Sequence, residues 1–205
     1  MHDSKLGELA RLIAAWPGLA AGPTDGLVED CLVLVDHLGD ARRVVDVGSG
    51  GGLPGLPVKI VRPDLDVVLV EADGDKAAFL VHACAQLGLQ GVEVDNRRAE
   101  EAARDPRLRE AFDLAVARAL APMPVLAELC LPFVRVGGRL LAQKTEAEDV
   151  GAAGRAIGML GGGPARVVAA PSNLRRAGTI VAVEKIGPTP DGYPRRAGLP
   201  ARKPL

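Results

Sequence analysis

The chain has 205 residues, of which 48% are hydrophobic and 25% charged, with a formal net charge of −1. This length can form one compact core, and the composition is that of an ordinary soluble globular protein. The longest apolar runs are broken well before the ~20 residues that cross a bilayer, and no apolar leader opens the chain. We therefore expect a cytoplasmic protein with no membrane partner.

The first 40 residues predict two helices. Apolar residues recur at helical spacing over residues 4–15, and Pro17 and Gly18 end this helix. A second helix is expected over residues 24–38, before Gly39. We expect both helices to pack on a sheet rather than to form a separate domain.

From residue 43, strand-like runs alternate with helical ones. The expected strands are 43–47, 66–71, 91–95, 113–117 and 137–144, with helices at 54–61, 74–87, 99–111 and 122–132. A helix over 146–160 precedes two final strands, 165–170 and 178–186, whose short connection predicts an antiparallel edge hairpin. The expected fold is α/β and Rossmann-like, with a mostly parallel seven-stranded sheet covered by helices on both faces.

A glycine-rich run follows the first expected strand. Residues 44–55 read VVDVGSGGGLPG, and the second strand ends at Glu71. Glycines let the backbone turn sharply and approach a ligand, and a carboxylate can accept two hydrogen bonds from a ribose diol. The pattern therefore predicts a cofactor that contains adenosine. The spacing from Asp46 (Asp-x-Gly-x-Gly-x-Gly) favours S-adenosylmethionine, although Gly50-x-Gly52-x-x-Gly55 also matches the dinucleotide pattern and keeps a nicotinamide open.

Cysteine and histidine give no sign of a metal site. Cys31, Cys84 and Cys130 are widely spaced and lack the paired spacing of metal ligands. We expect buried free thiols and no metal. The three histidines are equally scattered, and none has a partner that suggests nucleophilic catalysis.

Charge is distributed unevenly along the chain. Residues 166–205 hold eight basic and two acidic residues, a net charge of +6, so the preceding 165 residues carry −7. This asymmetry predicts an anionic partner for the C-terminal part, with a solvated basic tail as the alternative. Residues 187–205 are rich in proline and glycine, and we expect an extended, mobile tail after one domain of residues 1–186.

Five motifs together resemble one family in their order and spacing. These motifs are DVGSGGGLPGLP from Asp46, VEADGDKAAFL from Val70, Arg98-Ala99-Glu100, ARALAP from Ala117 and TPDGYPRRAGLPARKPL from Thr189. They are similar to the bacterial guanine-N7 methyltransferases of small-subunit ribosomal RNA, also called glucose-inhibited division protein B. The resemblance covers residues 43–205.

The resemblance implies a class I S-adenosylmethionine-dependent methyltransferase. Its expected substrate is a guanine N7 of 16S ribosomal RNA, free or in the small ribosomal subunit, and its expected product from the cofactor is S-adenosylhomocysteine. Guanine N7 has a lone pair and carries no hydrogen, so we expect no catalytic general base. We expect the enzyme to be a monomer.

The resemblance also implies the site residues. Arg118 would hold the methionine carboxylate or the target base, with a structural salt bridge as its alternative. Glu100 would meet the adenine, or else stabilise a helix N-terminus; Tyr193 would stack on a base, or else anchor the tail. The implied cofactor residues are Asp46, Gly48, Gly50, Gly52, Leu53, Glu71, Ala99, Glu100 and Arg118, and the implied RNA contacts are Lys144, Tyr193, Arg195, Arg196 and Lys203.

One segment departs from the family. Before the first strand, the family usually has an Arg-His pair and then an Asp-Ser or Asn-Ser step, where spacing places Glu29-Asp30-Cys31 and Leu34-Val35 here. An acidic pair would repel phosphate. Two alternatives therefore stay open: a methyltransferase that acts on another substrate, and a non-catalytic scaffold associated with RNA.

Overall fold

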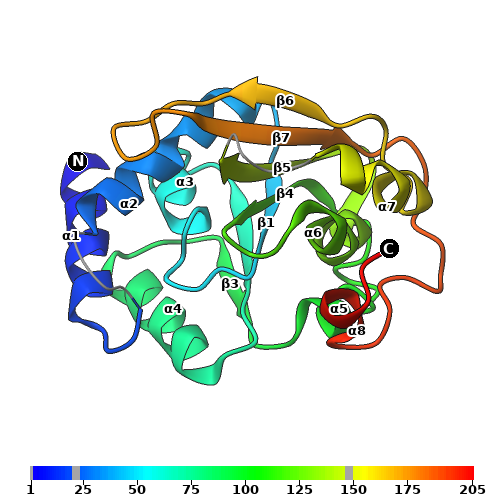
Figure 1. Ribbon diagram of the computed structural model, residues 1–205. Helices are drawn as coiled ribbons and strands as arrows, with labels where there is room; N and C mark the ends of the chain where they lie inside the picture. Colours follow the sequence, from blue (N-terminus) through cyan, green and yellow to red (C-terminus); the bar gives the residue numbers. More distant parts are fainter. Residues whose placement is uncertain (1, 20–23, 146–149) are drawn as a thin grey trace.

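A seven-stranded sheet runs through the computed structural model, which describes residues 2–19, 24–145 and 150–205 (Figure 1). Its order is β3-β2-β1-β4-β5-β7-β6. The first five strands are parallel, and β7 pairs antiparallel with both β5 and β6. The expected α/β fold with an antiparallel edge is confirmed. The strands are β1 (Arg43–Val47), β2 (Asp66–Val70), β3 (Val92–Asp95), β4 (Phe112–Arg118), β5 (Val134–Thr145), β6 (Arg166–Ala169) and β7 (Gly178–Glu184).

Helices cover both faces of this sheet because its strands alternate their side chains between two cores. In β1, Val44 belongs to one buried cluster, whereas Val45 and Val47 belong to the other. The cluster of Val44 packs against α1 (His2–Ala15), α2 (Asp25–Asp30), the 3₁₀ helix η1 (Cys31–His37), α3 (Gly55–Val61) and α4 (Gly74–Gln86). The opposite cluster packs against α5 (Ala99–Ala102), α6 (Met123–Cys130), the 3₁₀ helix η2 (Leu131–Phe133), the 3₁₀ helix η3 (Gly151–Ala153) and α7 (Gly154–Met159).

Two expected helices differ from the structure. The helix expected over 24–38 is an α-helix only to Asp30 and continues as η1. The helix expected over 99–111 ends at Ala102, because Pro106 disfavours helical geometry at Asp105, whose side chain instead accepts the Arg107 N–H at 3.0 Å. Of the helix expected over 146–160, residues 146–149 lie outside the described residues.

Cys31 and Cys130 are buried free thiols, as expected, whereas Cys84 is half-buried. Burial raises the pKa of both Cys31 and Cys130 above the ordinary thiol value. None of the helices within the described ranges is both long enough and apolar enough to cross a bilayer.

The expectation of an extended tail without regular structure is wrong. Residues 199–202 form α8 (Leu199–Arg202), which packs on α6 (Figure 1). The guanidinium of Arg109 donates hydrogen bonds of 2.8 Å to the carbonyls of Thr189 and Tyr193. These side-chain hydrogen bonds satisfy the backbone carbonyls of a segment that has no strand partner. The proline and glycine content of the segment does not indicate that such donors are available.

Candidate active site

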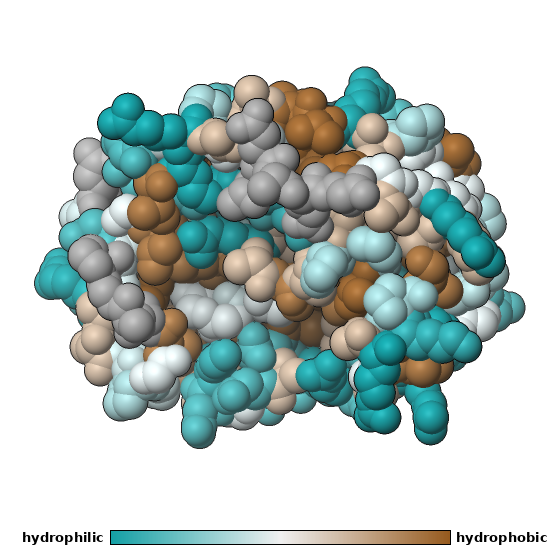
Figure 2. Space-filling view, viewed as in Figure 1, coloured by the Kyte–Doolittle hydropathy of each residue, from teal (hydrophilic) through white to brown (hydrophobic). Residues whose placement is uncertain are grey.

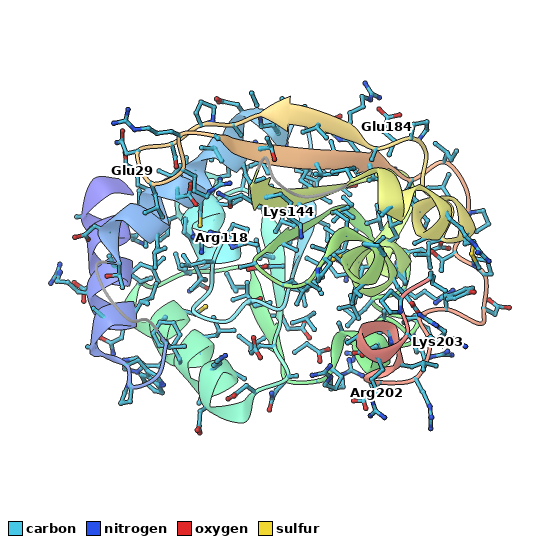
Figure 3. All side chains as sticks on the ribbon, in the orientation of Figure 1. Glu29, Arg118, Lys144, Glu184, Arg202 and Lys203 are labelled. Carbon is cyan, nitrogen blue, oxygen red and sulfur yellow. The ribbon has the colours of Figure 1, made fainter. Side chains whose placement is uncertain are left out.

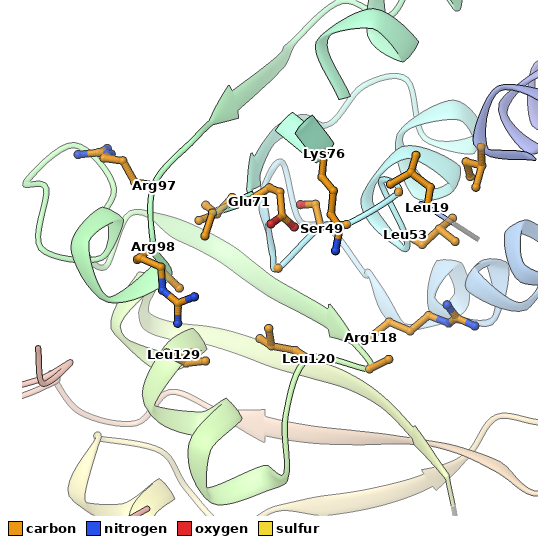
Figure 4. Close-up of a pocket in the computed structure, with 18 of the residues that line it drawn as sticks. Leu19, Ser49, Leu53, Glu71, Lys76, Arg97, Arg98, Arg118, Leu120 and Leu129 are labelled. Carbon is orange, nitrogen blue, oxygen red and sulfur yellow. Dashed lines mark hydrogen bonds between the residues drawn. The ribbon is translucent and has the colours of Figure 1, made fainter. Parts of the chain in front are cut away.

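A cavity of about 390 Å³ opens where β1, β2 and β4 end, within the range of small-molecule sites (Figure 4). The strand order reverses between β1 and β4, which is the position where open α/β sheets bind ligands. Figure 2 shows hydrophobic and hydrophilic residues side by side on this face. The wall consists of Ile13, Leu19, Leu27, Gly48, Ser49, Gly50, Gly51, Leu53, Val70, Glu71, Ala72, Lys76, Arg97, Arg98, Ala99, Glu100, Arg118, Ala119, Leu120 and Leu129.

The glycine loop closes one side of the cavity. The N–H groups of Gly48 and Ser49 donate to the carbonyl of Val70 at 2.8 and 3.1 Å, which ties the loop to β2. Gly48 has φ of +73°, and a Cβ there would overlap the side chain of Leu120 from the loop after β4. The positive φ and this close approach both favour glycine at position 48.

Asp46 lies behind this loop rather than on the cavity wall. Its carboxylate is fully buried and accepts the Gly55 N–H at 2.9 Å, while Oδ1 has no hydrogen-bond partner among the described residues. Burial raises the pKa of Asp46 to about 7. Asp46 therefore supports the loop from behind and does not line the cavity. Gly52 does not line it either, whereas Gly51 does.

Glu71 is positioned to face the cavity by two backbone donors. Oε2 accepts the Gly50 N–H and Oε1 accepts the Asp73 N–H, both at 2.8 Å. Each carboxylate oxygen has a second lone pair. The carboxylate can therefore accept two hydroxyl groups of a ribose without giving up either backbone bond.

Glu100 lies in the same wall and is linked to the C-terminal segment. Its Oε1 accepts the Gly198 N–H at 2.8 Å. Its Oε2 is buried 3.5 Å from Arg98 Nε and has no hydrogen-bond partner in the described part of the chain. This buried acceptor fits a ligand that brings an N–H donor, such as the amino group of adenine. Together with Glu71 and the glycine loop, it makes the cavity suitable for an adenosine group.

Arg118 lies at the other end of the cavity from Arg97 and Arg98 (Figure 4). Its Nε is 3.4 Å from Oδ2 of Asp30, so it lines the cavity and also forms an ion pair. Both expected roles of Arg118 are compatible with this position. Ala119, the next residue, has φ of +52°, in the left-handed region that non-glycine residues seldom adopt.

Several wall residues were not anticipated from the sequence. Ile13, Leu19 and Leu27 come from the N-terminal helical region and give the cavity an apolar side, with Leu19 at the end near Arg118 (Figure 4). Their helical spacing indicates only that they are buried. Arg97 and Arg98 line the opposite end, and the Arg-Ala-Glu motif at residues 98–100 was the one available signal for Arg98.

The structure separates the five expected RNA contacts. Lys144 is 8% exposed and donates to the Ala121 carbonyl, and Tyr193 packs against the buried core. Arg195 binds buried Glu128 through both carboxylate oxygens. Arg196 and Lys203 are exposed, and Figure 3 shows Lys203 beside Arg202, far from Lys144 and Arg118.

Half of the basic residues behind the +6 charge are paired with acidic side chains, three of them in buried or half-buried positions and Arg166 on the surface. Four of the eight form ion pairs, namely Arg166 with Glu184, Arg175 with Asp30, Lys185 with Glu110 and Arg195 with Glu128. The exposed remainder is Arg176, Arg196, Arg202 and Lys203. The charge count therefore overstates the basic surface that the C-terminal part presents.

The expectation that both acids of the N-terminal segment would repel phosphate is wrong for Asp30. Its side chain is fully buried and paired with Arg118 and Arg175. Glu29 is exposed and accepts a hydrogen bond from Asn173 Nδ2 at 2.9 Å. Of these two acids, Glu29 alone presents its negative charge to solvent.

The sheet order, with a cavity at its switch point, is that of the class I S-adenosylmethionine-dependent methyltransferase fold. Solved structures share the fold: MtNAS in complex with S-adenosylmethionine matches with a TM-score of 0.62 at 23% identity, covering 91% of this chain and 72% of that chain. The T. thermophilus 16S rRNA N2 methyltransferase RsmC, in complex with AdoMet and guanosine, has a TM-score of 0.53 at 20% identity. That match covers 73% of this chain and 36% of that chain.

Sequence comparison identifies the family. The model for rRNA small subunit methyltransferase G matches residues 24–176. A relative of that name from Moorella thermoacetica is 48% identical over 180 residues, 85% of this chain and 74% of its own length. One from Rubrobacter xylanophilus is 42% identical over 221 residues, 98% of this chain and 83% of its own length. The chain belongs to the rRNA small subunit methyltransferase G family.

Proposed function

We propose that this enzyme methylates N7 of a guanine in 16S ribosomal RNA, acting as a cytoplasmic monomer on the RNA or on the small ribosomal subunit. The family supports the substrate, since the relatives bear the name of a small-subunit ribosomal RNA methyltransferase. S-adenosylmethionine supplies a methyl group on a sulfonium: N7 bonds to the methyl carbon while the carbon–sulfur bond breaks, leaving its electron pair on sulfur.

The composition of the cavity wall is the observation that supports N7. Of the described residues that line it, none is His, Cys, Tyr or Asp, and the two acids, Glu71 and Glu100, hold backbone N–H groups. Because N7 attacks through a lone pair and carries no proton, this site needs alignment rather than a general base. Arg118 lines the end of the cavity opposite Arg97 and Arg98, and its N–H donors can bind O6 of a guanine while the N7 lone pair stays free to attack.

The N-terminal helices complete the proposed acceptor region. Leu19 and Leu27 line the cavity with apolar side chains, and Leu19 lies at the end near Arg118 (Figure 4). An apolar wall excludes water from the reacting atoms and supports a flat base beside the methyl group. Exposed Arg176, Arg196, Arg202 and Lys203 would contact phosphates, with an affinity that falls as salt rises.

The test uses purified protein with S-adenosylmethionine labelled in its methyl group. Acceptors are naked 16S RNA and assembled small subunits from cells that lack the gene, with a metabolite mixture as a third arm. Mass analysis of digested RNA should find one 7-methylguanosine, and Glu71→Ala should abolish it. Label at another atom refutes N7, label only in small molecules refutes RNA, and cofactor binding without any transfer favours the scaffold.

A further inference from the structure

Asp30 is a buried carboxylate that connects the acceptor end of the cavity to the β6–β7 loop. It is 0% exposed, and Nε of Arg175 lies 2.9 Å from both of its oxygens. Ser172 also donates to Oδ1. These partners come from the loop after β6, so Asp30 is held in place without any help from Arg118.

The register of the sheet brings Arg118 to this carboxylate. Arg118 at the end of β4 pairs with Gln143 on β5, so their side chains lie on the same face. Gln143 Nε2 donates to the Asp30 carbonyl at 2.7 Å and to its Oδ2 at 3.1 Å, and Arg118 Nε is 3.4 Å from that same oxygen. The end of α2 is therefore fixed against β4 and β5, on the β4 side of the site.

The contact engages Arg118 at one position only. No acceptor for Nη1 or Nη2 of Arg118 is found among the residues that the structure describes. A guanidinium held at Nε has its two terminal amino groups oriented yet available for a planar acceptor. The carboxylate thus fixes the direction of Arg118 without occupying the groups that a base or phosphate would use.

Charge supplies a second reason for this pairing. Methylation of N7 places a positive charge on the guanine, and a lone guanidinium beside it would oppose that change. The negative charge of Asp30 behind Arg118 reduces this repulsion. The benefit grows only as the reaction proceeds, so it belongs to the rate of transfer rather than to the binding of either substrate.

We propose that Asp30 is a positioning residue for methyl transfer, acting through Arg118 to orient it and to offset its charge. The proposal rests on the proposed function, because it requires an acceptor base at this end of the cavity. It also gives the acidic departure from the family's Arg-His pair a role inside the enzyme.

The test is a double-mutant cycle on the full-length protein, read as the single-turnover rate at saturating S-adenosylmethionine and RNA. Asp30→Asn should lower the rate about tenfold and leave the calorimetric Kd for S-adenosylmethionine within about threefold. In an Arg118→Ala background, the same change should lower the rate less than about twofold. Glu29→Gln, at the neighbouring exposed acid, is the matched control and should leave the rate unchanged.

Two further variants separate positioning from folding. Arg175→Gln removes the other cation from Asp30; it should lower Tm while changing the rate less than Asp30→Asn does. Arg118→Lys leaves the Asp30–Arg175 pair intact but has no Nε, so it should lose as much rate as Arg118→Ala. This variant keeps the test available if Asp30→Asn does not fold.

Distinct outcomes refute the two proposals. An unchanged rate in Asp30→Asn, an equal loss in the Arg118→Ala background, or full activity of Arg118→Lys overturns the role of Asp30. Equal effects of Asp30→Asn and Arg175→Gln on both Tm and rate would show a structural role only, which also overturns it. If the wild-type protein transfers no methyl group to RNA, the proposed function fails and this inference with it.

Discussion

Asp46 should make the stability of this protein depend on pH in an unusual direction. Burial raises the pKa of this carboxyl from 3.8 to about 7, although the Gly55 N–H and Ser49 act in the opposite direction. The folded state therefore binds the proton more tightly than the unfolded state, in which the pKa is near 4. As pH rises from about 4 to about 7, the unfolded chain ionises first and the folded state loses stability.

The size of this effect follows from the pKa difference. About three pKa units at about 1.36 kcal/mol each give a loss of about 4 kcal/mol once both states are ionised. Asp46→Asn keeps the shape and a carbonyl oxygen for Gly55 but cannot ionise. Between about pH 5 and about pH 8, its free energy of unfolding should therefore gain about 3 kcal/mol relative to the wild type.

Urea denaturation at several pH values measures this difference, and effects of other titrating groups cancel in it. Asp36→Asn, which removes a carboxylate from the exposed side of η1, is the matched control for the loss of one charge. The free energies of unfolding of the wild type and of Asp46→Asn are compared from about pH 5 to about pH 8. If the difference between them stays constant, the environment of the carboxylate does not resist ionisation, and the reasoning is refuted.

Two further predictions concern the cofactor site and the C-terminal segment. In Glu71→Gln, one of the two backbone N–H groups, of Gly50 or of Asp73, faces the amide NH₂ instead of a carboxylate oxygen. Calorimetry should therefore show S-adenosylmethionine binding weakened by about 1.5–3 kcal/mol. Unchanged affinity would contradict the role of Glu71. Arg195→Met leaves Glu128 buried without its cation and should lower the free energy of unfolding by about 3–5 kcal/mol. The exposed neighbour provides the control, because Arg196→Met should change the free energy of unfolding by less than about 0.5 kcal/mol. Equal changes in the two variants would contradict the docking of the C-terminal segment on the domain.

The sequence by itself determined the sheet and the place of the cofactor site. Strand runs such as residues 44–47 place apolar side chains on both faces, Val44 in one core and Val45 and Val47 in the other, which requires helices on both faces. The spacing from the glycine loop to Glu71 spans one βαβ unit, and parallel strands bring both to the same edge. These features depend on local pattern and chain order, which a sequence contains.

Only the tertiary structure decided which charged residues are available. Arg195 and Arg196 are adjacent and identical in type, yet one is bound to Glu128 and the other is exposed. From the sequence, Asp30 is indistinguishable from a surface acid. In the folded protein it is paired with Arg118 and Arg175, which lie 88 and 145 residues further along the chain. Ion pairing depends on distances of a few ångströms between residues remote in sequence, and that information arises only when the chain is folded.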